Sequence, residues 1–148
     1  MGSVANLKMD LSYLLTPFIA WLAAGCLKFL INSIRAKKLA FGLIGYGGLP
    51  SNHSAIVSSM AALIALKEGI GHPVFGLAVT LAFIVMLDAS SLRKQVGKQA
   101  TAINNLTKTL TARPADLRER MGHTPIEILA GAITGVCVAY FTVSIQFA

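Results

Sequence analysis

Long stretches without a charged side chain are the feature that most constrains how this chain folds. Four stretches contain no Asp, Glu, Lys or Arg: residues 11–27, 39–66, 69–87 and 128–148. A helix needs about 20 mostly apolar residues to cross a bilayer. The first stretch, which continues past Lys28 to Ile34, and the third and fourth stretches therefore predict membrane-spanning helices. We expect the first to be retained rather than cleaved as a signal peptide.

The second stretch divides into two parts. Residues 39–54 are rich in glycine and contain Pro50, whereas residues 55–66 form a compact run dominated by Ala, Ile and Leu. That run is short for a membrane span unless its helix begins near Ser51. Only 13% of the 148 residues are charged, against roughly 25% in soluble domains. The sequence thus predicts one all-α domain over residues 1–148, an integral membrane helical bundle of about four transmembrane helices.

Much of the positive charge lies between the third and fourth apolar stretches. The chain has 13 Lys and Arg against 6 Asp and Glu, and residues 93–120 are rich in Lys and Arg. Apolar residues there recur at steps of three and four: Leu92, Val96, Ala100, Ile103, Leu106 and Leu110. This spacing predicts an amphipathic helix, which either lies on the membrane interface or continues the third span out of the bilayer.

The distribution of basic residues predicts an orientation, because short loops rich in Lys and Arg stay in the cytoplasm. Residues 35–38 and 93–120 are basic, whereas the turn over 67–72 holds one Lys and one Glu. With four spans, both basic segments fall on one side, and both termini and the turn fall on the other. We expect a bacterial inner-membrane protein whose basic face is cytoplasmic, unless the basic residues serve a phosphorylated substrate on the other side.

The two cysteines, Cys26 and Cys137, have neither the spacing of a disulfide framework nor that of metal ligands. We expect both to be small hydrophobic residues of the core.

Ionisable side chains at membrane depth are energetically costly and usually functional. Lys28 and Arg35 are seven residues apart and share one helix face, so they either bind an anion together or extend to the lipid headgroups. Asp88 ends the third apolar stretch. It either pairs with a nearby base such as Arg93 or Lys28, or it is an interfacial charge.

Residues 45–54 form the most informative loop of the sequence. Glycines permit a tight backbone there, and Ser51 or Asn52 can cap the helix that follows Pro50. A helix N-terminus presents free N–H groups and a partial positive charge, which suits a phosphate. His53 would lie in the first turn, where an imidazole can protonate a leaving oxygen. The alternative is a plain loop with a capped helix and an interfacial histidine.

His123 and Glu127 are four residues apart and would share a helix face. A carboxylate bonded to one imidazole nitrogen fixes the tautomer and leaves the other nitrogen nucleophilic. Residues 124–127 also match a capping box, with Thr124 as N-cap and Pro125 at the first helical position. From spacing alone, Glu127 serves either the imidazole or the cap.

Taken in order, these motifs resemble the signatures of the type 2 phosphatidic acid phosphatase superfamily, which are K-x6-R-P, P-S-G-H and S-R-x5-H-x3-D. The matching positions here are Lys28 and Arg35, residues 50–53, an arginine, and then His123 and Glu127. Residues 47–55, 88–100 and 122–125 are similar to the superfamily's divergent branch. That branch comprises small membrane proteins also described as acid phosphatase/vanadium-dependent haloperoxidase-related. The resemblance covers about residues 20–135.

The resemblance implies a phosphatase that needs neither metal nor cofactor. His123 would be the nucleophile that forms a phosphohistidine, Glu127 would orient it, and His53 would protonate the leaving alcohol. The implied substrate-binding set comprises basic side chains, loop backbone and neighbouring polar residues: Lys28, Arg35, Gly48, Ser51, Asn52, Asp88, Arg93 and Arg118.

The sequence departs from the superfamily pattern at three positions. Ala36 stands where the pattern has Pro, Asn52 where it has Gly, and Leu117 where it has the third-motif Arg. That arginine is therefore Arg93 or Arg118. Usual members have six transmembrane helices, whereas this chain can supply about four. A homodimer could provide the missing packing surface, and a native mass measurement in detergent tests this hypothesis.

The expected function is that of a membrane lipid phosphatase. Its substrate would be an anionic lipid such as phosphatidylglycerophosphate, phosphatidate or a polyprenyl diphosphate, and a cytoplasmic site fits the first two better. The alternative is a non-enzymatic lipid or anion carrier, which would need the basic residues but not both histidines. Haloperoxidase activity is disfavoured, and so is nucleic-acid binding, because the basic residues border the membrane without interleaved aromatics. The expected partners are the membrane and a phosphorylated lipid.

Overall fold

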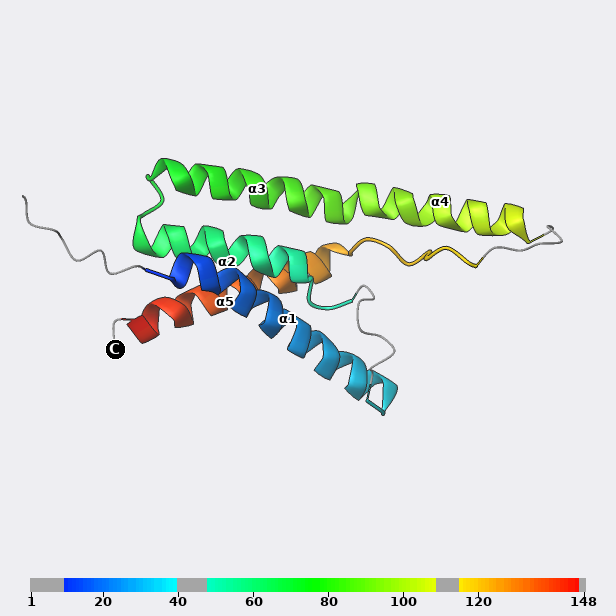
Figure 1. The fold of residues 1–148 in the computed structure, drawn as a ribbon, viewed down its shortest axis with the longest axis horizontal. Helices are drawn as coiled ribbons and strands as arrows, with labels where there is room; N and C mark the ends of the chain where they lie inside the picture. The colour runs from blue at the N-terminus through cyan, green and yellow to red at the C-terminus, as the bar shows by residue number, and fades with distance from the viewer. Residues whose placement is uncertain (1–9, 40–47, 109–114, 147–148) are drawn as a thin grey trace, which may run out of the picture.

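The computed structural model describes residues 10–39, 48–108 and 115–146, and every regular element in these ranges is an α-helix (Figure 1). The helices are α1 (Ser12–Ala36), α2 (Asn52–Lys67), α3 (Pro73–Ser90), α4 (Leu92–Thr107) and α5 (Pro125–Gln146). Within the described ranges, three helices have the length and apolar composition to cross a membrane: α1, α3 extended by α4, and α5. The predicted all-α membrane bundle is confirmed.

The short helix α2 lies against all three of these helices. It packs on α1, α3 and α5, and it buries small and polar residues such as Ser54, Ala55 and Ser59. Its 16 residues span about 24 Å at 1.5 Å per residue, less than the roughly 30 Å hydrocarbon core of a bilayer. α2 is therefore a short buried helix rather than a fourth full-length span. Ser51 is its N-cap, and the Ser51 hydroxyl accepts a hydrogen bond from the Ser54 N–H.

Small residues let α5 lie close against α2. Gly131, Gly135 and Ala139 recur every four residues, so they share one face of α5, and all three are buried. A Cβ atom at Gly131 would lie only 2.9 Å from the Cβ of Ser54. Without side chains at the two glycines the backbones pack directly, as they do between membrane helices whose interface is lined by small residues.

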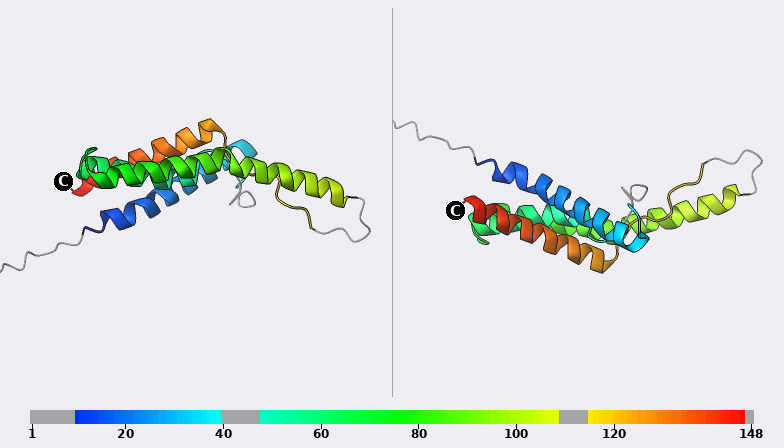
Figure 2. Two further views of the ribbon diagram at one scale, coloured as in Figure 1. Left: turned by 90° about the horizontal axis from the view of Figure 1, so that it is seen from above. Right: turned by 90° about the horizontal axis from the view of Figure 1, so that it is seen from below.

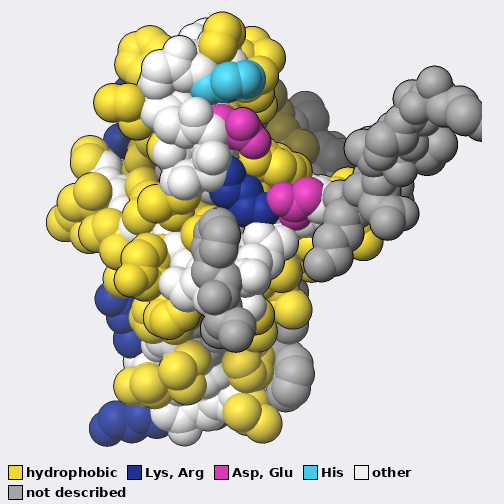
Figure 3. All heavy atoms as spheres, turned by 90° about the vertical axis from the view of Figure 1, so that its left-hand side faces the viewer, with side chains coloured by type: hydrophobic (Ala, Val, Ile, Leu, Met, Phe, Trp, Pro, Cys, Tyr) yellow, Lys and Arg dark blue, Asp and Glu magenta, His cyan; other side chains and the backbone are white. Residues whose placement is uncertain are grey.

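One end of the bundle gathers the two ends of the described chain and the turn between α2 and α3. Lys67, at the end of α2, bonds to Asp10 and to Ser12, and Gln146, at the end of α5, donates to Asp10. Figure 3 shows this end, where a few charged side chains lie amid hydrophobic ones. The basic residues that follow α1 and α3 lie toward the other end, so the predicted relative placement of turn, chain ends and basic segments is confirmed.

α4 continues α3 beyond the other helices, as Figures 1 and 2 show, which is one of the two arrangements expected for it. The large side chains of the predicted apolar stripe lie on the exposed face of α4, where an amphipathic helix at a membrane interface would present them. Its large apolar side chains are exposed, Leu106 among them, whereas Gly97, Ala100 and Asn104 are buried. α4 packs against the extended segment 117–122 through these small and hydrogen-bonding side chains, because the close approach of a backbone leaves no room for large ones.

Cys26 and Cys137 are exposed on α1 and α5 rather than buried in a core. The expectation failed because helices that cross a membrane carry apolar residues on the faces that meet lipid as well as on those that meet protein. An apolar neighbourhood in the sequence therefore does not identify a core position in this chain.

Candidate active site

Backbone hydrogen bonds join the start of α2, the start of α5 and the end of α3. The Ser51 N–H donates to the carbonyl oxygen of Glu127 over 2.9 Å, and the His123 N–H donates to that of Ala89 over 2.9 Å. Ser51 is fully buried. These bonds fix three segments that are far apart in the sequence, and with them the positions from which His53 and His123 extend.

His123 and Glu127 form the pair that their spacing allows. His123 is buried, and its Nδ1 lies 3.2 Å from Glu127 Oε2. The same carboxylate oxygen accepts the Thr124 N–H over 2.9 Å, and the Thr124 hydroxyl accepts the Glu127 N–H over 3.3 Å. Glu127 therefore serves both the imidazole and the helix cap. Because an ionised carboxylate only accepts, neutral His123 carries its proton on Nδ1 and keeps a lone pair on Nε2.

Arg93 connects Asp88 to His53. Its Nε donates to Asp88 Oδ2 over 2.7 Å, so of the two bases expected for Asp88 the structure pairs it with Arg93. Its Nη1 lies 3.4 Å from His53 Nε2. A guanidinium can only donate, so His53 Nε2 is the acceptor in this arrangement. A phosphate bound beside Arg93 would compete for its guanidinium and leave His53 Nε2 available to carry a proton.

Positive charge converges on the two histidines. Lys28 and Arg93 are close enough to both His53 and His123 to act on them through charge, and His123 is close enough to act on His53 in the same way. Lys28 also interacts through charge with Arg118. One cationic site thus surrounds the two imidazoles, and its residues come from α1, α2, α4 and the segments 117–122 and 123–127.

Burial lowers the pKa of His123 from its usual value near 6.5. The hydrogen bond and the charge of Glu127 oppose this effect, whereas the cations Lys28 and Arg93 add to it. The net direction keeps His123 neutral at pH 7, which is the protonation state that a nucleophilic imidazole needs.

The loop before α2 contributes Gly48 and Asn52. Gly48 is buried with a φ of 143°, a conformation that favours glycine. A Cβ atom there would lie 3.9 Å from Asn32 Oδ1. Asn32 was not predicted as a site residue, although a polar residue one turn beyond Lys28 in an apolar stretch is a signal for one. Asn52 Oδ1 is buried and has no hydrogen-bond partner among the described residues.

Arg35 and Arg118 are placed differently with respect to this cluster. Arg35 is exposed in the last turn of α1, where that helix diverges from α2 (Figure 1). It is not among the charges that act on either histidine. Phosphate binding by Arg35 stays a prediction, whereas Arg118 reaches the cluster through Lys28.

The cluster suits an anion better than a cation. In the ranges that the structure describes, no group of three His, Cys, Asp or Glu side chains is placed to hold a metal ion. Its Lys and Arg side chains instead match the several oxygens of a phosphate group, which cationic donors bind through short charged hydrogen bonds.

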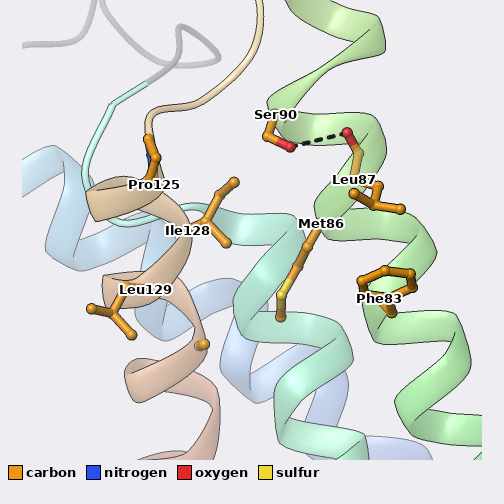
Figure 4. A pocket seen from close by; sticks show the side chains of 8 residues that line it. Phe83, Met86, Leu87, Ser90, Pro125, Ile128 and Leu129 are labelled. Atoms are coloured by element: carbon orange, nitrogen blue, oxygen red, sulfur yellow. Dashed lines mark hydrogen bonds between the residues drawn. The ribbon is translucent and has the colours of Figure 1, made fainter.

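A groove opens between α3 and the start of α5 (Figure 4). Its volume is about 350 Å³, and apolar side chains with a single hydroxyl line it: Phe83, Met86, Leu87, Ser90, Pro125, Ile128, Leu129 and Ala132. Ser90 follows Ala89, whose carbonyl holds the His123 backbone. The groove therefore lies between the apolar faces of two spanning helices, near the segments that meet at the Ala89–His123 backbone bond.

Comparison with known proteins finds a matching family over most of the chain. Residues 9–138 match the family described as "Divergent PAP2 family". The "Uncharacterized membrane protein YuiD" of Bacillus subtilis (strain 168) is 32% identical over 148 aligned positions, and the alignment covers 86% of this chain and 94% of that protein. No solved structure matches the chain. The matched family span includes every predicted site residue, from Lys28 to Glu127.

Proposed function

The chain belongs to the divergent PAP2 family, and from this membership we propose that it is a membrane phosphatase that hydrolyses an anionic lipid phosphate through a phosphohistidine. The observation that carries the proposal is the 3.2 Å contact between His123 Nδ1 and Glu127 Oε2. His53 on α2 supplies a second imidazole within charge range of the first. A nucleophile, a carboxylate that orients it and a second acid–base group are what this reaction needs.

The reaction proceeds in two steps. First, His123 Nε2 attacks phosphorus, the bond from phosphorus to the alcohol oxygen breaks, and His53 gives its proton to that oxygen. Glu127 holds the Nδ1–H of the resulting phosphohistidine. Second, water attacks phosphorus, His53 takes a proton from the water, and the phosphorus–nitrogen bond breaks to release phosphate. Lys28 and Arg93 neutralise the phosphate oxygens, because phosphoryl transfer depends chiefly on positioning and charge neutralisation.

The groove between α3 and α5 supports a lipid as the substrate. Its lining includes Pro125, two residues after His123, and it lies between helices of membrane-spanning length, so the acyl chains of a lipid phosphate bound in the cationic site would extend toward these apolar side chains. The basic segments at the same end favour an anionic headgroup and a cytoplasmic active site in the bacterial inner membrane. Phosphatidylglycerophosphate and phosphatidate meet these requirements.

Phosphate release by the purified protein in liposomes tests the proposal. The substrates are phosphatidylglycerophosphate, phosphatidate and undecaprenyl diphosphate, each offered to the wild type and to His53→Ala. We expect release from one of these lipids and a loss of about 10²–10⁴-fold in His53→Ala, the usual contribution of a general acid–base group. No release from any lipid by a folded protein that still binds vanadate would contradict turnover and favour an anion carrier.

Filling the groove should discriminate lipid from soluble substrates. Ala132→Phe places a ring among the lining residues, and we expect KM for a long-chain lipid phosphate to rise at least about tenfold because several buried methylenes lose their contacts. KM for a short soluble phosphomonoester should not change. Cys137→Phe adds nearly the same bulk at an exposed position of α5 outside the groove and is the matched control. Equal effects of Ala132→Phe on both substrates would contradict an acyl chain in the groove.

The pH dependence should report the neutral state of His123. Because the pKa of His123 is lowered, the acid limb of the kcat/KM profile, where His123 becomes protonated, should lie below about pH 6.5. Glu127→Gln removes the carboxylate that raises this pKa, so the acid limb should move to lower pH while the rate decreases. Profiles of kcat/KM for both proteins measure this. An acid limb that moves upward in Glu127→Gln would contradict the assignment.

A further inference from the structure

α4 holds one buried polar side chain that the proposed reaction does not use. Asn104 is 4% exposed. Its Nδ2 donates to the Leu117 carbonyl oxygen and to Glu119 Oε1, each over 2.9 Å, and its Oδ1 accepts the Leu117 N–H over 2.8 Å. The Asn104 carboxamide thus pairs with both the N–H and the C=O of Leu117, two groups that would otherwise need a neighbouring strand as partner. It therefore fixes where Leu117 lies along α4.

Two glycines keep the same segment close to the helices. A Cβ atom at Gly97 would clash with the Glu119 carbonyl oxygen, and one at Gly122, where φ is 83°, would lie 3.2 Å from the Ala89 carbonyl oxygen. Residues 117–122 therefore lie directly against α4 and the end of α3. The segment cannot slide along α4 without breaking the hydrogen bonds of Asn104.

This segment brings Arg118 to the cationic site. Arg118 directly follows Leu117, the residue that the carboxamide holds, and it lies on the segment that runs from α4 to His123. Its charge also acts on Lys28. Arg93, the other candidate for the third-motif arginine, lies on α4 itself and is held by Asp88, whereas Arg118 lies on the extended segment and its Nε donates to the Arg120 carbonyl oxygen over 3.3 Å. Of the two arginines, Arg118 is thus the one whose place depends on how α4 holds the extended segment.

We propose that Asn104 is a positioning residue for the phosphate site, because its hydrogen bonds to Leu117 and Glu119 hold Arg118 where it binds the substrate phosphate. This role rests on the proposed function. Asn104 contacts neither histidine, so its loss should weaken binding of the anion and leave the transfer steps intact. The expected signature is a raised KM with an unchanged kcat, which general loosening of the fold would not produce.

Asn104→Leu tests this role, since it keeps the size of the side chain and removes its hydrogen bonds. We expect KM for the hydrolysed lipid phosphate to rise about tenfold, the size of one charged hydrogen bond, with kcat within about twofold of the wild type. Asn105→Leu is the matched control, because Asn105 is the next residue, is exposed and accepts only a surface bond from Lys108. An unchanged KM in Asn104→Leu, or a loss confined to kcat, would overturn the proposal.

Arg118→Ala shows whether Asn104 acts through Arg118. The single variant should raise KM as Asn104→Leu does, and the double variant should raise it no further, because both changes remove the same contact. Additive effects would overturn the proposal. Asn104→Ser retains one hydrogen-bonding group and should give a KM between those of the wild type and Asn104→Leu. If Asn104→Leu does not fold, Asn104→Ser replaces it in the comparison with Arg118→Ala.

Binding of inorganic vanadate, measured calorimetrically, separates this role from the proposed function. Vanadate affinity should fall about tenfold in Asn104→Leu, the size of one charged hydrogen bond, whether or not the protein releases phosphate. Such a fall without turnover of any lipid would leave the role of Asn104 supported and the phosphatase proposal contradicted. Equal vanadate affinity in the two proteins would overturn the role of Asn104, whatever their activity.

Discussion

Replacing His123 with asparagine is expected to reduce phosphate release by at least about 10³-fold, the usual consequence of removing a nucleophile. Asparagine can still offer an N–H toward Glu127, but it has no ring nitrogen that can attack phosphorus. The His123 backbone bond to Ala89 does not involve the side chain, so the fold should persist. The measurement is turnover, in the same liposomes, of the lipid phosphate that the wild type hydrolyses.

A trapped intermediate gives a second readout of the same prediction. Phosphohistidine survives in alkali, so alkaline denaturation during turnover of a labelled lipid phosphate should leave label on the wild type and none on His123→Asn. Glu127→Gln is the matched control because it leaves the nucleophile in place, and it should accumulate label more slowly. Label on His123→Asn, or turnover at the rate of the wild type, would contradict a nucleophilic role for His123.

The identity of the helices followed from the sequence because a bilayer leaves the chain few alternatives. Backbone polar groups in lipid must be satisfied within the segment, so charge-free stretches of span length become helices. α1, α3 and α5 accordingly begin and end within a few residues of the predicted bounds. The sequence could not predict in the same way which face of each helix packs against the other helices, because apolar side chains face lipid as well as protein. The exposed Cys26, Cys137 and Leu106 show this directly.

The candidate site was predictable where it depends on local spacing. His123 and Glu127 stand one helical turn apart, so their contact is set by the helix itself. The approach of Arg118 to Lys28 and the bonds of Asn104 to Leu117 depend instead on how residues 117–122 return along α4. No local period encodes that return, because its determinants are two glycines and one carboxamide. Long-range backbone packing is therefore what the sequence pattern left undetermined.

Replacing Gly135 with alanine is expected to destabilise the bundle by about 3 kcal/mol, the upper range for overpacking a tight interface. The added Cβ atom would lie 2.8 Å from the Ser59 backbone nitrogen and closer still to the Ala55 carbonyl oxygen. Both neighbours are backbone atoms of α2, so α5 must move away from α2 to make room. Gly76→Ala is the matched control, because a Cβ atom at Gly76 on α3 meets nothing within 4 Å. That change should be neutral, or stabilise the helix by up to about 1 kcal/mol.

The two alanine variants also test whether helix packing sets the geometry of the site. α5 begins just after His123 and carries Glu127, and α2 carries His53, so any separation of α5 from α2 separates the two imidazoles. Gly135→Ala should therefore lose activity at temperatures below its own unfolding midpoint in detergent, whereas Gly76→Ala should retain it. Equal unfolding midpoints for the two variants would contradict the close packing of α2 on α5. Equal activities would show that the distance between the imidazoles does not depend on that packing.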